Sequence, residues 1–209
     1  MIRRFAAVRS RILAPLALVV CAPDGLTAQV SLQLSAGLRY SSALVRDSIV
    51  TPFDVRPALA PVVVVTLAAP LQHDWAPVVT VDFSTSTLTR HDADGSSTNL
   101  DRVSTLAFTV GVRRRLPAGF TVGAGAGGLK YLPSEDSGIF RQGSGALAGV
   151  GALTLGHVLP LGAGRHVSIE ARYDLHPFIT PALRAEGFDA SRLVHRVALT
   201  VRTDWGATR

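Results

Sequence analysis

His91, Asp92 and Asp94 lie close together in the sequence and offer side chains that a divalent cation can bind. A calcium loop places its acidic ligands at fixed intervals and closes the site with a further acid. The polar segment from residue 91 to residue 102 has no acid at that closing position. We therefore predict a solvated loop here and assign no metal-binding residues.

A run of glycines, Gly123, Gly125, Gly127 and Gly128, has the composition of a nucleotide-binding turn. Such a turn leads from a strand into the helix whose N-terminus holds the phosphates. Here the glycines lie inside a segment that alternates small and apolar residues, and no helical pattern follows it. Close packing inside the fold explains them better, so we predict no cofactor and no cofactor-binding residues.

Charged residues form a third group, and their chemistry is that of ion pairing. Each lies on the polar side of a segment in which apolar and polar residues alternate. Opposite charges in a confined space satisfy one another, whereas an unpaired buried charge is costly. The group consists of Arg39, Asp82, Arg113, Glu170, Arg172, Asp174, Arg196 and Arg202.

The segment from Val30 to Ser41 shows the alternation most clearly, with apolar residues at every even position and Ser, Gln, Gly or Arg between them. An unbroken period of two predicts a strand with one apolar face. Seven similar segments follow, although the faces of the second stay unassigned. The eight predicted strands span residues 30–41, 57–69, 77–90, 103–116, 120–132, 144–159, 166–178 and 193–205.

The connections between these strands are long and short in turn. Polar loops at 43–56, 91–102, 133–143 and 179–191 alternate with short turns at 70–76, 117–119 and 160–164. Outer-membrane barrels have long external loops and short periplasmic turns. We predict an all-β fold over residues 29–209. It is an eight-stranded antiparallel up-and-down transmembrane β-barrel with both termini in the periplasm, in which the last strand closes against the first.

The first 28 residues read as a cleavable signal peptide. Four arginines precede an apolar stretch from Ile12 to Ala22, and Ala28 stands just before Gln29. Removing the peptide leaves 17 of the 21 basic residues and 14 of the 15 acidic ones, so the high pI does not indicate nucleic-acid binding. The single cysteine, Cys21, falls within the peptide.

The polar face of the strands indicates what surrounds the barrel. It consists mainly of Ser, Thr and Gly, and the whole chain has one lysine, Lys130. A face turned to bulk water would carry many Lys and Glu residues, whereas small polar side chains fit inside an eight-stranded barrel. We expect the apolar face to contact lipid; a secreted ligand-binding barrel is the less favoured alternative.

Aromatic residues should then gather at the two membrane interfaces. A bulge at Gly127-Gly128 would turn Tyr131 outward and add it to this set. The predicted interfacial residues are Trp75, Phe120 and Trp205 on the periplasmic side and Tyr40, Tyr131, Tyr173 and Phe178 on the outer side.

Closing the barrel would bring the charged residues of the last two strands beside Arg39 of the first. Asp82 and Arg113 would face them from the other wall. Because the interior of such a barrel is about as wide as its own side chains, the sequence predicts a lumen plugged by charge pairs.

The chain resembles the small outer-membrane β-barrel families typified by OmpX and the transmembrane domain of OmpA. The resemblance rests on the signal peptide, the alternating strands, the unequal connections and a last strand that ends in Trp205. It implies a place in the bacterial outer membrane, contact with lipopolysaccharide and phospholipid, and recognition of the segment 197–205 by the outer-membrane assembly machinery. It also implies a structural or surface-interaction role.

Some barrels of this size are lipid A-modifying enzymes. The deacylases among them are known for a Ser-His-Glu arrangement, in which serine and histidine lie two residues apart on a late strand. This spacing lets one base activate one hydroxyl. Here the late histidines, His176 and His195, have no serine in that place. The sequence favours a protein without catalytic residues, with a small-solute channel as the first alternative and a lipid A-modifying enzyme as the second.

Overall fold

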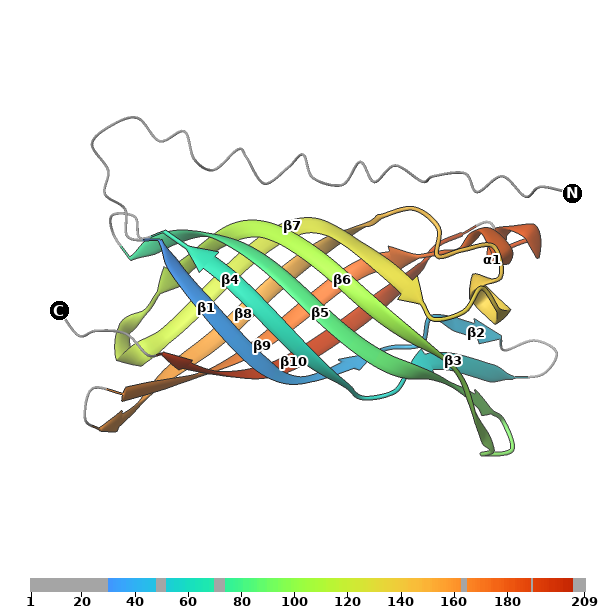
Figure 1. Ribbon diagram of the computed structural model, residues 1–209, viewed down its shortest axis with the longest axis horizontal. Helices are drawn as coiled ribbons and strands as arrows, with labels where there is room; N and C mark the ends of the chain where they lie inside the picture. The colour runs from blue at the N-terminus through green and yellow to red at the C-terminus, as the bar shows by residue number, and fades with distance from the viewer. Residues whose placement is uncertain (1–29, 48–51, 70–73, 163–164, 189, 205–209) are drawn as a thin grey trace, which may run out of the picture.

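The computed structural model describes residues 30–47, 52–69, 74–162, 165–188 and 190–204, and this part of the chain is almost entirely strand (Figure 1). The signal peptide predicted at residues 1–28 lies outside these ranges. Short helices are η2 (Pro117–Gly119), η3 (Gly138–Phe140) and α1 (Pro181–Ala185). None of the described helices is both long enough and apolar enough to cross a membrane. The strands are β1 (Ser31–Ser41), β2 (Val45–Asp47), β3 (Phe53–Pro57), β4 (Ala60–Ala68), β5 (Trp75–Asp92), β6 (Ser97–Arg115), β7 (Phe120–Pro133), β8 (Ala148–Gly162), β9 (Arg165–Phe178) and β10 (Arg192–Asp204).

Eight of the strands close into an antiparallel barrel, which confirms the predicted fold. In the order β1, β4, β5, β6, β7, β8, β9 and β10, each strand pairs with the next. Strand β10 then returns to β1, with Ala36 opposite Val201 and Ser41 opposite Arg196. Closure removes the open edge that a sheet would otherwise present.

The two ends of the barrel differ. We call the end where β1 begins and β10 finishes the short-turn end, because the turns β4–β5, β6–β7 and β8–β9 lie there. The opposite, long-loop end carries β2, β3, η3 and α1 (Figure 1). In α1, the side-chain oxygen of Thr180 accepts the Leu183 N–H at 3.3 Å, which caps the helix, and Pro181 occupies its first position.

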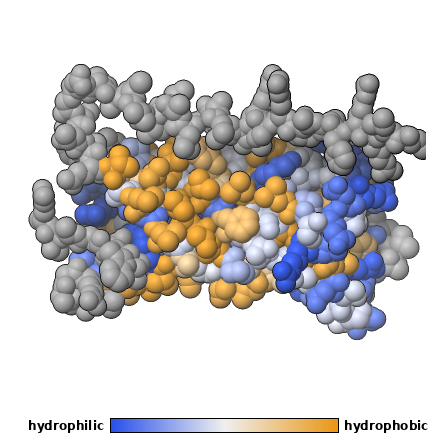
Figure 2. Space-filling view, viewed as in Figure 1, coloured by the Kyte–Doolittle hydropathy of each residue, from blue (hydrophilic) through white to orange (hydrophobic). Residues whose placement is uncertain are grey.

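Side chains alternate between the interior and the outer surface along each barrel strand. Strand β4 now has assigned faces, since Val62 and Val64 are buried while Val63 and Val65 are exposed. On the face seen in Figure 2, apolar residues cover the middle of the barrel, and hydrophilic residues gather toward its ends, most clearly at the long-loop end. The exposed apolar side chains come from every barrel strand.

The bulge predicted at Gly127-Gly128 was wrong. Strands β6 and β7 pair in one continuous register, with Gly127 opposite Thr109 and Gly128 opposite Phe108. A Cβ atom on Gly127 would collide with the backbone oxygen of Phe108. The glycine therefore permits a close approach of two strands and does not shift the phase of β7.

Two of the predicted loops contain strand structure. The segment 43–56 forms β2 and most of β3, and β3 pairs with β5 from Phe53 opposite Asp92 to Pro57 opposite Leu88. Strands β5 and β6 extend through the predicted loop 91–102 and leave only a turn at residues 93–96. Side chains on both faces of this extension are exposed or half-buried. Backbone pairing builds such a hairpin without an apolar face, so hydropathy gave no sign of it.

Candidate functional site

Asp82 lies at the centre of the barrel interior, where three arginines surround it. Its Oδ1 accepts from Arg39 Nη1 at 2.5 Å and from Arg196 Nη2 at 3.4 Å. Its Oδ2 is 3.6 Å from Arg172 Nη2. The side chains of Asp82, Arg39 and Arg196 are each 1% exposed. One carboxylate is therefore shared by three buried guanidinium groups.

Asp174 is the second acid of this layer. Arg172 Nε donates to Asp174 Oδ1 at 2.7 Å, and Arg39 Nη2 is 3.6 Å from Oδ2. Hydroxyl groups take some of the remaining arginine donors, for example Thr109 at 3.3 Å from Arg172 Nη2. We call the five charged residues of this layer the central charge layer: Arg39, Asp82, Arg172, Asp174 and Arg196. Its three cations exceed its two anions, so each acid stabilises more than one arginine.

A second layer lies closer to the short-turn end. Arg113 Nη2 donates to Glu170 Oε2 at 2.8 Å, with side chains 13% and 17% exposed. Gln33 Oε1 accepts from Arg113 Nη1 at 2.9 Å and from Arg202 Nη1 at 2.5 Å. Arg202 Nη2 also donates to Ser168 Oγ at 3.0 Å. We call this group of residues near the short-turn end the outer charge layer: Gln33, Arg113, Ser168, Glu170 and Arg202. The side-chain amide of Gln33 joins arginines from opposite walls of the barrel.

All eight residues of the predicted charge network thus face the interior, in two layers. The sequence placed Asp82 as a contributor from the far wall, whereas the structure makes it the shared partner of three arginines. Sequence reasoning did not identify Gln33 as a bridge. The signal was present, since Gln33 lies on the polar face of β1, but its partners depend on how the strands are staggered around the barrel.

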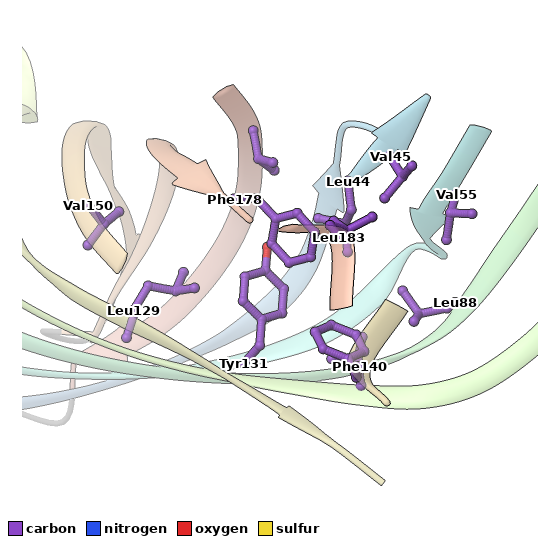
Figure 3. Close-up of a cluster of buried hydrophobic side chains, with 13 residues drawn as sticks. Leu44, Val45, Val55, Leu88, Leu129, Tyr131, Phe140, Val150, Phe178 and Leu183 are labelled. Carbon is purple, nitrogen blue, oxygen red and sulfur yellow. The ribbon is translucent and has the colours of Figure 1, made fainter. Parts of the chain in front are cut away.

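The long-loop end of the interior holds an apolar plug that the sequence analysis missed. Loop and strand residues converge there on Tyr131, Phe140 and Phe178 (Figure 3). The Phe178 ring meets Tyr131 edge-on at 5.0 Å between centroids and Phe140 at 6.0 Å. The buried members are Leu44, Val45, Val55, Leu88, Val103, Ala107, Leu129, Tyr131, Phe140, Val150, Phe178, Leu183 and Val194. This plug covers the barrel interior above the central charge layer.

Tyr131 and Phe178 are therefore not interfacial residues, and the prediction for both was wrong. They are 5% and 4% exposed and belong to the plug. Tyr131 keeps the inward phase of β7 because that strand has no bulge at Gly127. Phe178 keeps the phase of Asp174 and His176 on β9. The Tyr131 hydroxyl lies 3.2 Å from His176 Nε2, so polar atoms at the base of the plug face the charged interior.

Four other predicted interfacial residues lie on the outer surface. Tyr40, Trp75, Phe120 and Tyr173 have exposed side chains. The Arg114 guanidinium lies 5.5 Å from the Trp75 ring centre. Their contact with lipid stays a prediction, and Trp205 lies outside the described residues.

His195 also lies on the outer surface, where its Nδ1 is 2.6 Å from the Tyr173 hydroxyl. The pair stands on the apolar face of β9 and β10. The hydrogen bond gives the imidazole a partner within the protein, which suits a tolerated residue near an interface.

The turn at residues 93–96 carries Asp94, one of the residues considered for a metal loop. Hydrogen bonds from the side chain and the backbone N–H of Ser96 lower the pKa of this carboxyl group. Among the described residues, no group of three or more His, Cys, Asp or Glu side chains could hold a metal ion.

The described strands thus form a closed barrel around a packed interior of two charge layers and an apolar plug, and the exposed side chains along the strands include apolar residues from every barrel strand. That arrangement suits a surrounding of lipid and satisfies the backbone hydrogen bonds within the sheet. The chain is a transmembrane β-barrel.

No protein-family model matches this barrel's sequence, and no curated protein matches it. A solved structure of Ail from Yersinia pestis has 15% sequence identity and a TM-score of 0.44, covering 83% of this chain and 97% of Ail. OprG from Pseudomonas aeruginosa has 12% identity and a TM-score of 0.46, covering 82% and 91%. The outer-membrane protein AlkL has 12% identity and a TM-score of 0.40, covering 90% and 98%. These likenesses concern the fold alone.

Proposed function

We propose that this chain is a bacterial outer-membrane barrel with a structural or surface-interaction role, whose lumen is closed to solutes. The observation that carries the proposal is the filling of the interior by three successive layers. The outer charge layer, the central charge layer and the apolar plug follow one another from the short-turn end to the long-loop end. A barrel closed in this way can present its loops at a surface while it keeps the membrane sealed.

The space between the two charge layers supports a closed lumen. A cavity there, lined in part by Thr109, Arg113, Glu170 and Arg172, has a volume of about 20 Å³. A site of roughly 10–15 Å³ measured in this way holds one water molecule. A space of this size suits a buried water molecule and is smaller than a hydrated ion, which supports the proposal of a closed lumen.

The proposed location predicts how the protein fractionates. Expressed with its first 28 residues in a Gram-negative host, it should enter the outer-membrane fraction with Gln29 as its first residue. An unboiled sample should migrate differently from a boiled one on a detergent gel, because a closed ladder resists detergent. Recovery as a soluble periplasmic protein, with identical mobility before and after boiling, would contradict the proposal.

Planar-bilayer recording tests the closed lumen. We expect the purified barrel to produce no steady current, because two charge layers and the plug lie in series. A large open porin, inserted under the same conditions, controls for successful insertion. Steady unitary conductance from the unmodified protein would favour the alternative of a small-solute channel.

A further inference from the structure

Strands β1 and β10 stop pairing before they reach the long-loop end of the barrel. Their pairing ends at Ser41 opposite Arg196, followed by a hydrogen bond from the Ser42 N–H to the His195 oxygen at 2.8 Å. Beyond this point the chain leaves β1 for β2, while β10 continues to Arg192. Within the described residues, the first part of β10, which begins at Arg192 opposite Phe178, pairs only with β9.

A cavity of about 260 Å³ lies between the segment that follows β1 and the start of β10. Its floor belongs to the apolar plug, which contributes the buried side chains of Leu44, Val45, Phe178 and Leu183 (Figure 3). Because these side chains pack against the rest of the plug, the floor is held in place without a ligand.

The rest of the cavity wall is more exposed than the floor and carries positive charge. Phe188 is 43% exposed and extends the apolar surface outward. Of the described residues that line the cavity, the charged ones are Arg46 and Arg192, and both are cationic. Arg46 is 3.7 Å from Asp54, and its side chain is 56% exposed, so water screens this pair. No ion pair joins Arg192 to another residue in the described part of the chain.

We propose that this cavity binds a single-chain amphipathic anion, with its alkyl chain on the plug residues and its anionic head group at Arg192 and Arg46. Burial of the chain removes apolar surface from water, and an arginine offers several donors to a carboxylate. The volume favours one chain over a diacyl lipid, since it lies just below the roughly 300–1,000 Å³ of typical ligand pockets. The proposal goes beyond the proposed function and does not depend on whether the lumen conducts.

Binding of radiolabelled dodecanoate to the barrel in phosphatidylcholine nanodiscs tests the proposal, with empty nanodiscs measuring partition into lipid. We expect saturable binding of one dodecanoate per barrel, weaker binding of 1-dodecanol and none of butyrate. Arg192→Gln should weaken dodecanoate binding by about fivefold, the upper range for an exposed ion pair, and leave 1-dodecanol unchanged. Ala190→Trp, which fills the cavity from its wall, should abolish binding of both.

Arg141→Gln is the matched control. Arg141 is an exposed arginine at the same end of the barrel that pairs with Glu186 and does not line the cavity. The gel mobility shift shows that each variant is folded. Binding no greater than that of empty nanodiscs overturns the proposal, as does equal binding of dodecanoate and 1-dodecanol that Arg192→Gln leaves unchanged. Loss of dodecanoate binding in phosphatidylglycerol nanodiscs would show that a diacyl membrane lipid takes the site, and would overturn the assignment to a single-chain ligand.

Discussion

Asp82→Asn should lower the free energy of unfolding by about 3–5 kcal/mol, the loss expected when one partner of a buried ion pair is removed. The substitution keeps the shape of the side chain but removes the charge that Arg39, Arg172 and Arg196 share. Asp174 would then be the remaining acid of the central charge layer. Urea titration of the barrel in lipid vesicles measures the change in the free energy of unfolding, with the gel mobility shift reporting the folded fraction at each urea concentration.

Glu170→Gln provides the control for this experiment. Glu170 pairs with Arg113, but both side chains are partly exposed, and Arg113 keeps its hydrogen bond to Gln33. We expect a loss of about 1 kcal/mol, as for a solvent-screened pair. Similar losses of stability for Asp82→Asn and Glu170→Gln would mean that the central charge layer does not contribute more to stability than the outer charge layer.

Removal of a positive charge should partly restore the Asp82 variant. In Asp82→Asn with Arg196→Met, one of the cations stranded by the first change is replaced by an apolar side chain of similar length. A stability above that of Asp82→Asn alone would give the coupling energy between the two residues. Strictly additive losses would argue that Arg196 interacts mainly with other groups.

Phe178→Ala should have the second large effect, a loss of about 3–5 kcal/mol, the range for a phenylalanine removed from a packed core. The ring packs edge-on against Tyr131 and Phe140 within the plug. Its loss should therefore loosen the connection between β7 and β8, which carries Phe140. Urea titration gives the stability, and limited proteolysis of that connection reports the loosening.

Phe120→Ala distinguishes a plug residue from an interfacial one. Phe120 faces outward at the short-turn end, where it is 43% exposed and lies beside His157. Removing it should cost about 1 kcal/mol, the scale of a single aromatic contact. If Phe178→Ala cost no more than Phe120→Ala and left the connection resistant to protease, Phe178 would behave as the interfacial residue that the sequence predicted.

The sequence by itself determined the barrel. The alternation in Val30–Ser41 and its later copies follows directly from the pleat of a strand, which sends successive side chains to opposite faces. Connection lengths then order the strands, and a polar face of Ser, Thr and Gly indicates which side is the interior. For the same reason, all eight charged residues could be placed inside before any partner was known.

Only the tertiary structure decided which of these residues meet. Asp82 reaches Arg39, Arg172 and Arg196 because the stagger of the strands sets the height of each residue along the barrel, and no local pattern encodes that height. Tyr131 and Phe178 point inward because β7 and β9 keep their phase to their ends. Residues outside the strands, such as Leu44, Phe140 and Leu183, complete the plug, and they follow no period. Their burial depends on contacts between segments far apart in the chain, which hydropathy along a single segment does not report.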